Sequence, residues 1–572
     1  MKKPILNSLW LARLSAQLVL VMLLGACTDN SGVTIYPARH ILTMEPGSEG
    51  HSALAVQGGR IVGLGSQTGL QAEFASEAVR LDTTFADKTL MPGFIDPHIH
   101  PSIAAVILPL DIVSAMEWAT PSGTTIAVKT EAHFRARLSA LLSEKGPDEV
   151  LFTWGYHELY HGPLNRNILD DISSTQPIVV WQRSVHELYF NTAALEMYGM
   201  SESDFAASEQ ANWQEGHLWE TGLFAVGQSV FMELVSPLKY LKGLSMMSST
   251  LHKGGLTTVG EQGGPQLNEY LEFFGMALET WGGIPYRYVV VPNAMYYMKR
   301  LDSVADVEEK AQSLVDSYKP FKIIKHIKLY VDGAMFSPAM KMSEAFIDGH
   351  HGEWMMTPEQ QQSIFDVFWD KGWHFHLHVN GDAGLDQVLS MVEKKREISP
   401  RDDVRIVLEH YGYAREEQHQ RVKDLGIVVS NNAYYLHELA PIYASAQLGP
   451  ERAADISPLG GLARAGVPFS FHSDYFMAPA EPLTQVWVAV NRIASDGKVW
   501  GEHQKIALDL ALRAITTEAA YSLGMESEIG SIKLGKRADF TVLAENPYDV
   551  DPKLLKDIAI WGTVLDGTLH PL

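Results

Sequence analysis

The segment between residues 94 and 474 alternates short apolar runs with longer amphipathic stretches, and this alternation constrains the fold more than any other feature. Stretches such as TPEQQQSIFDVFWDKG and REEQHQRVKDLG have the length and the pattern of helices. Strands that alternate with helices pair in parallel, so eight strand–helix units predict an α/β protein with a TIM-type (β/α)8 barrel. The eight runs with the composition of buried strands are FIDPHIH (94–100), LTTVGEQ (256–262), YRYVVV (286–291), HIKLYVDG (326–333), HFHLHVNG (374–381), RIVLEH (405–410), IVVSNN (427–432) and PFSFHSD (468–474).

Two further units are expected around this repeat. Between the first two runs, at about 104–250, the chain is too long for one crossover, which predicts an insertion with its own strands at LFTWGY and PIVVWQRS. Short alternating strands fill 34–92, where an antiparallel arrangement is expected, and similar strands return at 526–572. We expect the two terminal segments to pair into one composite β-sandwich, which leaves 93–525 as the barrel with its insertion.

The start of the chain has the features of a bacterial lipoprotein. A basic beginning followed by an apolar run predicts a signal peptide over residues 1–26. The segment LGAC (24–27) resembles a lipobox, and Cys27 is the only cysteine in the chain. We therefore expect lipidation of Cys27, a tether over 27–33, and a cell-envelope protein that contacts the membrane through its lipid alone. Thr28 follows Cys27 at the position where lipoproteins retained in the inner membrane usually have aspartate. The outer membrane is therefore the expected location.

Composition argues against several kinds of partner. The formal net charge of −23 disfavours binding to nucleic acid or to an anionic membrane surface by charge. A hydrophobic content of 46% and a charged content of 20% are typical of a folded globular protein. The sequence leaves the oligomeric state open.

Potential metal ligands lie at the carboxyl ends of the predicted strands. In a (β/α)8 barrel the functional side chains gather at that end. The two histidines of the first strand are two residues apart, so both imidazoles face the same side of the strand. Every side chain at these strand ends is a metal-ligand type or can become one, which predicts a metal centre. These residues are His98 and His100 on the first strand, Lys328 on the fourth, His378 on the fifth, His410 on the sixth and Asp474 on the eighth.

The same residues stand in motifs of a known superfamily. PGFIDPHIH, IKLYVDG, HVNGD, LEH and HSD resemble motifs of the metal-dependent amidohydrolase superfamily, and GSIKLGKRADFTVL resembles its β-sandwich. The insertion and the sequence LNRNILDDISSTQPIVVWQRSVHELYFNTAAL resemble the YtcJ-like amidohydrolase 3 family, which includes enzymes that cleave N-substituted formamides. The resemblance covers essentially the whole mature chain. One departure is His472 in FHSD, where the family usually has glycine, so the pocket is expected to be reshaped there.

The resemblance implies a centre of two divalent ions. One ion would be held by His98, His100 and Asp474. The second would be held by His378 and His410. Neutral imidazoles and a carboxylate suit zinc, with manganese, iron and cobalt as alternatives.

The resemblance also implies an unusual role for a lysine. Lys328 would be carboxylated by carbon dioxide, which turns a cationic side chain into an anionic carbamate that bridges the two ions. The ions would activate water for attack on a carbonyl. Asp474 would take the proton and pass it to the leaving nitrogen.

Other polar residues near these motifs have simpler interpretations. His374 and His376 share a face with His378 but lie deeper in the predicted barrel, so we interpret them as core histidines. Asp382 is interpreted as the cap of the helix that follows. Lys328 is flanked by apolar residues in mid-strand, which favours an inward side chain over a surface lysine.

The sequence therefore predicts a metal-dependent hydrolase that cleaves a C–N bond other than a peptide bond, of the N-acyl or N-formyl amide type. A deaminase is a rival, but the H-x-x-E arrangement of such enzymes is absent after His378. The sequence is also compatible with hydrolysis of esters or lactones, and with ligand binding without turnover. A partly apolar small-molecule substrate is predicted if aromatic residues of the insertion reach the barrel mouth. These aromatic residues include Trp118, Trp154, Trp181, Trp213 and Trp219.

Overall fold

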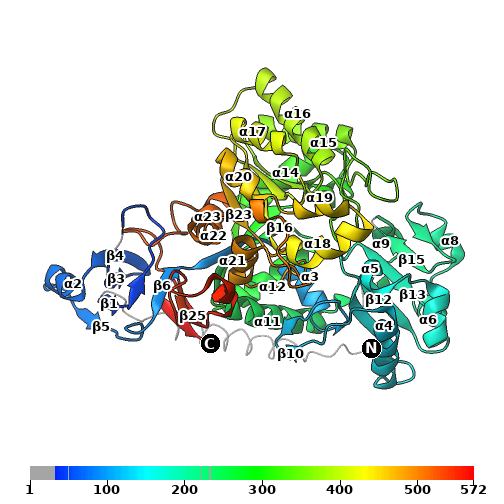
Figure 1. Cartoon of the computed structure of the whole chain (residues 1–572), viewed down its shortest axis with the longest axis horizontal. Coiled ribbons are helices and arrows are strands. Elements are labelled where there is room, and N and C mark those ends of the chain that lie inside the picture. The colour runs from blue at the N-terminus through cyan, green and yellow to red at the C-terminus, as the bar shows by residue number, and fades with distance from the viewer. Residues whose placement is uncertain (1–31, 49, 220, 228, 231–233, 318) are drawn as a thin grey trace, which may run out of the picture.

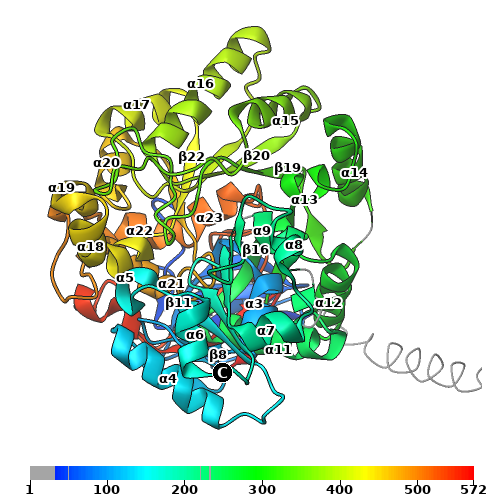
Figure 2. The same ribbon diagram turned by 90° about the vertical axis from the view of Figure 1, so that its right-hand side faces the viewer.

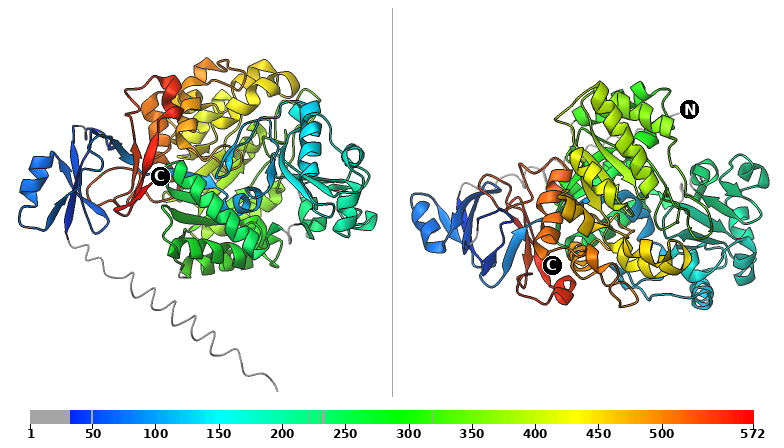
Figure 3. Two further views of the ribbon diagram at one scale, coloured as in Figure 1. Left: turned by 90° about the horizontal axis from the view of Figure 1, so that it is seen from below. Right: turned by 45° about the horizontal axis from the view of Figure 1, so that its top comes forward.

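The computed structural model describes residues 32–48, 50–219, 221–227, 229–230, 234–317 and 319–572. The expected signal peptide, Cys27 and most of the tether lie outside these residues. Figure 1 shows three parts in a row, with sheets from the chain ends on the left, a central α/β part, and the insertion on the right. The two views of Figure 3 show the same order. Within the described part of the chain, no helix is both long enough and apolar enough to cross a membrane.

Eight parallel strands form the centre of the molecule, and each lies where the sequence predicts one. They are β7 (Phe94–Ile99), β16 (Leu256–Gly264), β17 (Arg287–Pro292), β19 (His326–Tyr330), β20 (His374–Val379), β21 (Ile406–His410), β22 (Val428–Asn431) and β23 (Phe469–Phe471). Strands β7, β16 and β17 pair in that order in one sheet, which ends at the short β18 (Lys322–Ile323). Strands β19 to β23 pair in chain order in a second sheet.

Backbone contacts join the two central sheets at both of their edges. Asn293, directly after β17, forms a parallel bridge with Lys328 of β19. At the other edge, the amide of Asp474, just beyond β23, donates to the carbonyl oxygen of His98 in β7 over 2.9 Å. The carboxyl ends of the first and last strands therefore lie side by side, although His98 and Asp474 are far apart in the chain.

Helices follow most of these strands and cover the central sheets from outside. They include α11 (Pro237–Lys253), α12 (Glu269–Trp281), α14 (Val304–Asp316), α15 (Pro358–Asp370), α16 (Asp382–Ile398), α17 (Glu416–Asp424), α18 (Tyr434–Ala446), α20 (Leu459–Ala465) and α21 (Pro482–Asn491). Figure 2 shows α12, α14, α15, α17 and α20 placed around β19, β20 and β22.

Helix α15 shows how the sequence sets these elements locally. The Thr357 hydroxyl accepts from the Gln360 amide over 3.3 Å, while the Gln360 side chain accepts from the Thr357 amide over 3.0 Å. This capping box, with Pro358 in the first turn, satisfies amides that a helix start leaves free. Phe365 and Trp369 are among the buried residues of the helix, and both rings contact Phe375 of β20. The amphipathic pattern thus fixes the helix against the strand that follows it.

Strands from the two chain ends share one sheet. Its order is β2 (His40–Ile41), β6 (Thr89–Pro92), β24 (Phe540–Leu543), β25 (Ile560–Leu565) and β26 (Thr568–Pro571). A second sheet holds β1 (Val33–Pro37), β3 (Ala53–Gln57), β4 (Arg60–Gly65) and β5 (Val79–Leu81). The expectation of purely antiparallel pairing was wrong, because β5 runs parallel to β1 and β2 runs parallel to β6. Both sheets contribute to one apolar cluster, in which Leu54 packs with Phe85, Leu90 and Phe540.

The insertion forms a six-stranded sheet of its own. LFTWGY is β11 (Leu151–Tyr156), and PIVVWQRS contains β12 (Ile178–Gln182), as the sequence predicts. These two strands pair in parallel, and β12 then pairs antiparallel with β13 (Glu187–Phe190). The sheet is completed by β8 (Asp111–Ile112), β14 (Ala211–Asn212) and β15 (His217–Trp219). The turn between β12 and β13 points to the central strands and lines a cavity there.

Candidate metal centre

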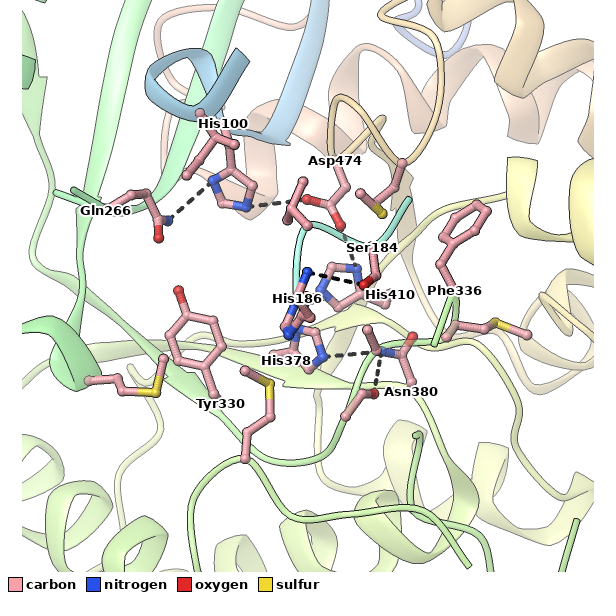
Figure 4. Close-up of a pocket in the computed structure, with 18 of the residues that line it drawn as sticks. His100, Ser184, His186, Gln266, Tyr330, Phe336, His378, Asn380, His410 and Asp474 are labelled. Carbon is pink, nitrogen blue, oxygen red and sulfur yellow. Dashed lines mark hydrogen bonds and ion pairs between the residues drawn. The ribbon is translucent and has the colours of Figure 1, made fainter. Parts of the chain in front are cut away.

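One cavity is lined by all six residues that the sequence assigns to a metal centre. It has a volume of about 200 Å³ and lies at the carboxyl ends of the central strands. Figure 4 shows His100, His378, His410 and Asp474 converging on it from different elements. His98 and Lys328 complete the set.

Three of these side chains form a tight group around one point. Nε2 of His98 lies 3.3 Å from Nε2 of His100 and 3.7 Å from Oδ1 of Asp474. Nε2 of His100 lies 3.2 Å from the same oxygen. Two imidazole nitrogens and a carboxylate oxygen at these separations can bind one divalent ion together, since metal–ligand distances are about 2.0–2.2 Å.

The other three predicted ligands lie beside this group. Nζ of Lys328 is 3.5 Å from Nε2 of His98. The ring centroids of His378 and His410 are 4.3 Å apart, and Nδ1 of His410 is 3.6 Å from Oδ2 of Asp474. Nε2 of His410 is buried and has no hydrogen-bond partner within the described residues. A buried imidazole nitrogen without a hydrogen-bond partner can bind a metal through its lone pair. Its position among neutral imidazoles therefore fits a second divalent ion.

Two glutamates hold the imidazoles of the first strand, and neither was predicted from the sequence. Oε2 of Glu409 lies 2.7 Å from Nδ1 of His98, and Oε1 of Glu261 lies 3.1 Å from Nδ1 of His100. Glu261 also accepts from the Ser102 amide over 3.2 Å. A carboxylate at Nδ1 fixes the proton there and leaves Nε2 free to bind a metal. The available signal was an acidic residue inside an apolar strand, in VGEQ and in VLEH.

Burial controls the protonation of the centre. It lowers the pKa of His98, His378 and His410 well below the usual value, with the nearby Lys328 charge acting in the same direction. His100 differs. Burial again disfavours its charged form, but hydrogen bonds to Asp474 and Glu261 and their charges outweigh burial and raise the pKa of His100 to about 9. Burial lowers the pKa of Lys328 to about 8, against the opposing charges of Glu409 and Asp474.

Backbone geometry also orients two of the candidate ligands. His410 has φ of 74° and Asp474 has φ of 49°, both in the left-handed region that only glycine adopts freely. Each such residue costs about 1–3 kcal/mol and persists only where its surroundings hold it. Around Asp474 this support includes the buried carboxylate of Asp96, which accepts from the amide and hydroxyl of Ser473. Burial raises the pKa of Asp96 to about 7.

The remaining predictions for polar residues met different outcomes. His376 is buried between Glu409, 2.5 Å from its Nδ1, and His326, 2.9 Å from its Nε2. His374 accepts from the Arg405 amide over 2.9 Å, outside the cavity. His376 is therefore a core histidine, as expected, whereas His374 is only half-buried at the start of β20. The interpretation of Asp382 as a helix cap was wrong. Gly381 is at the cap position of α16, and the Asp382 carboxylate instead pairs with Arg415 and accepts from the Ser343 amide.

The insertion and the surrounding loops supply apolar walls. Trp181 lines the cavity, whereas Trp118 and Trp154 are buried in the core and do not line it, so only some of the aromatic residues reach the site. Ser184 and His186 add polar groups from the turn after β12, and sequence reasoning did not assign them to the site. The apolar lining from the central part includes Met295, Met335, Phe336, Met355, Tyr435 and Met477.

A buried cation fastens the insertion to the loop after β23. The Arg183 guanidinium donates to the carbonyl oxygens of Phe476 and Met477, over 2.5 Å and 3.0 Å. It also pairs with Glu438 of α18 over 3.0 Å, and both side chains are at most 1% exposed. The residues that follow Asp474 are therefore held by the insertion, which was not apparent from the sequence.

Comparison with known proteins identifies the family. The amidohydrolase family matches residues 86–569, so the chain belongs to that family. It is 24% identical to an N-substituted formamide deformylase of Arthrobacter pascens, covering 93% of this chain and 97% of that protein. It is also 23% identical to YtcJ of Bacillus subtilis, which is named as a candidate amidohydrolase. That alignment covers 94% of this chain and 98% of YtcJ.

The solved structures support the fold. A metal-dependent hydrolase from Pyrococcus horikoshii superposes with a TM-score of 0.68 at 20% sequence identity. The match covers 94% of this chain and all of that chain. The α/β fold expected from the sequence therefore matches the fold of a solved metal-dependent hydrolase over nearly the whole length of this chain.

Proposed function

We propose that the protein is a two-metal amidohydrolase that cleaves N-formyl or N-acyl amines. The observation that carries the proposal is the convergence of His98, His100 and Asp474 within 3.2–3.7 Å of one another at the wall of a single cavity. His378, His410 and Lys328 complete the second half of the centre. In this proposal the two central sheets close into the eight-stranded barrel, and zinc is the preferred metal on ligand chemistry.

Different residues of the centre would have different roles in the reaction. Bound divalent ions would supply an acidified water and polarise a carbonyl group. Asp474 contacts His98, His100 and His410, so its carboxylate is placed to accept the water proton and to deliver it to the leaving nitrogen. A carbamate on Lys328 would replace a cation by an anion between the two ions.

Polar side chains in the cavity wall would orient the amide. Gln266 and Tyr330 point into the cavity from one side, and Asn380 does so from the other (Figure 4). Gln266 also contacts Nδ1 of His100 over 3.3 Å, which places its amide next to the centre. These groups can hydrogen-bond to a substrate carbonyl or N–H and so orient the amide beside the residues that would hold the ions.

The walls of the cavity favour an apolar substituent on the nitrogen. Four methionines and several aromatic rings line it, and methionine adapts to ligands of varied shape. The relative from Arthrobacter pascens is named for the removal of formyl groups from N-substituted formamides. We therefore include N-formyl amines with an aryl or alkyl substituent among the first substrates to test.

The location belongs to the proposal as well. Lipidation of Cys27 would place the barrel in the cell envelope, with the outer membrane as the favoured site. The terminal segments 34–92 and 526–572 would then form a β-sandwich domain beside the hydrolase domain over 93–525.

A turnover screen of the purified full-length chain tests this function. We expect release of formate or of a carboxylic acid from N-formyl and N-acyl amines, with rates that depend on added Zn²⁺ and are lost on chelation. Asp474→Asn keeps the shape of the side chain and should lower kcat by at least a hundredfold, because the general base is removed. Asp403→Asn, at an exposed position, is the matched control. Saturable binding without product would support ligand binding as the function, and turnover of esters or lactones alone would exclude the amide assignment.

A further inference from the structure

His472 lies buried between the two halves of the centre and is not one of the six predicted ligands. It is the first residue after β23, and its ring centroid is 4.6 Å from that of His98 and 5.0 Å from that of His410. The groups of histidines that could hold an ion include His98, His410 and His472 together. The hydrogen bonds of its two ring nitrogens decide what this imidazole does.

The Nδ1 atom of His472 faces acceptors. It lies 2.7 Å from Oγ of Ser430 and 3.5 Å from Oε2 of Glu409. A carboxylate accepts only, and a hydroxyl can accept, so the imidazole proton belongs on Nδ1. Nε2 of the neutral ring then carries a lone pair and can only accept. Its neighbour is Nδ1 of His410 at 3.2 Å, which must therefore be the donor.

The other neighbours of His410 agree with this direction. Its Nδ1 also lies 3.6 Å from Oδ2 of Asp474 and 3.3 Å from the hydroxyl of Tyr435, and both oxygens can accept a proton. With the proton on Nδ1, the lone pair of His410 is on Nε2. That is the nitrogen that is buried without a partner within the described residues.

We propose that His472 is a positioning residue for the second metal ion: it fixes the tautomer and the ring orientation of His410, so that Nε2 is presented to the metal. The inference rests on the proposed two-metal centre. Glu409 anchors both halves, because it holds His98 directly and reaches His410 through His472. Acceptors that take the second ring N–H of a metal-bound histidine, such as carboxylates and backbone carbonyls, contribute to metal affinity in this way in other proteins.

The test compares two replacements of similar size in the full-length chain. His472→Gln places an amide oxygen near the former Nε2 and keeps an acceptor for His410, whereas His472→Leu keeps volume but removes the acceptor. Metal-free protein is titrated with Zn²⁺ against a chromophoric chelator, which gives the number of ions and both dissociation constants. We expect two ions in the native chain, a second dissociation constant within about threefold of native for the Gln variant, and about 10- to 100-fold weaker second binding for the Leu variant.

Three results would overturn the proposal. Native affinity in both variants would make His472 a packing residue, and an equal loss in both would show that the imidazole itself is needed, as a ligand would be. A native chain that binds a single ion would remove the basis of the inference. His472→Met, also without an acceptor, replaces the Leu variant if the latter fails to fold, and His161→Gln controls for loss of a buried imidazole elsewhere. Because the readout is metal binding, absence of amide turnover would count against the proposed function and not against this role.

Discussion

Lys328 offers the most direct test of the proposed centre, because its carboxylation needs a neutral amine. Burial lowers its pKa from 10.5 to about 8. By the Henderson–Hasselbalch relation, about 10% of the side chain is neutral at pH 7, against about 0.03% for an unperturbed lysine. The structure thus raises the reactive fraction roughly 300-fold, equivalent to about 3 kcal/mol. The neutral amine can add carbon dioxide, with release of one proton, to form the carbamate.

The assay reconstitutes metal-free protein with Zn²⁺ in buffer stripped of carbon dioxide, with and without added bicarbonate. We expect bicarbonate to increase binding of the second ion and amide turnover together. When dissolved carbon dioxide, and not bicarbonate, is held at the same concentration, the initial rate of this activation should fall about tenfold per pH unit below pH 8, because protonation removes the neutral amine. Lys328→Ala and Lys328→Arg should lose most turnover and show no response to bicarbonate. Lys325→Ala, which lies outside the cavity, is the matched control and should respond as the native chain does.

Two results would refute this reasoning. One is full loading with two ions and full turnover in buffer without carbon dioxide. The other is mass analysis of the active, loaded protein that finds Lys328 unmodified. A short carboxylic acid that restores turnover to Lys328→Ala, but not to the native chain stripped of metal, would support a bridging role for the carbamate.

Three further predictions address the anchor, the metal and the insertion. Cys27→Ser should move the protein from the membrane fraction to the soluble periplasm or leave an unprocessed precursor, and a variant that remains mature and membrane-bound would contradict the lipobox interpretation. The pKa of His100 is raised to about 9, so a metal ion that binds this imidazole below pH 9 must displace a proton. The affinity for Zn²⁺ should therefore fall about tenfold per pH unit below pH 9. An affinity that does not change between pH 6 and pH 8 would exclude this competition. Arg183→Met leaves the Glu438 carboxylate buried and unpaired, so the free energy of unfolding measured with urea should fall by about 3–5 kcal/mol. The double variant Arg183→Met, Glu438→Gln should recover part of this lost stability, because it removes the unpaired charge. Equal stability of the single variant and the native chain would show that the pair contributes nothing.

Local patterns were enough to predict the central strands, and the six candidate ligands chosen from the sequence line one cavity. Each strand is a run of apolar residues bounded by helical stretches, and the period of the pattern changes at its ends, as between α15 and β20. The candidate residues could be brought together in advance because the carboxyl ends of parallel strands meet at one edge, so a histidine at position 378 or 410 can be chosen as a candidate without knowledge of its neighbours. The mixed pairing near the amino terminus was missed, since strand direction depends on partners and not on composition.

What the sequence could not show is which residues support these candidate ligands. Glu409 and His98 are 311 positions apart in the chain. Their side chains meet only because the fold brings β7 of one central sheet close to β21 of the other. The same is true of Arg183, which reaches the loop after Asp474 from an insertion whose placement no local pattern specifies. His472 shows the limit most clearly. Its position in the motif suggested a changed pocket, but its effect depends on Ser430 of β22 and on Glu409 and His410 of β21, whereas His472 itself follows β23. A ligand can be recognised from its own chemistry, whereas a positioning residue is defined by the direction of its hydrogen bonds, and that direction exists only in the folded chain.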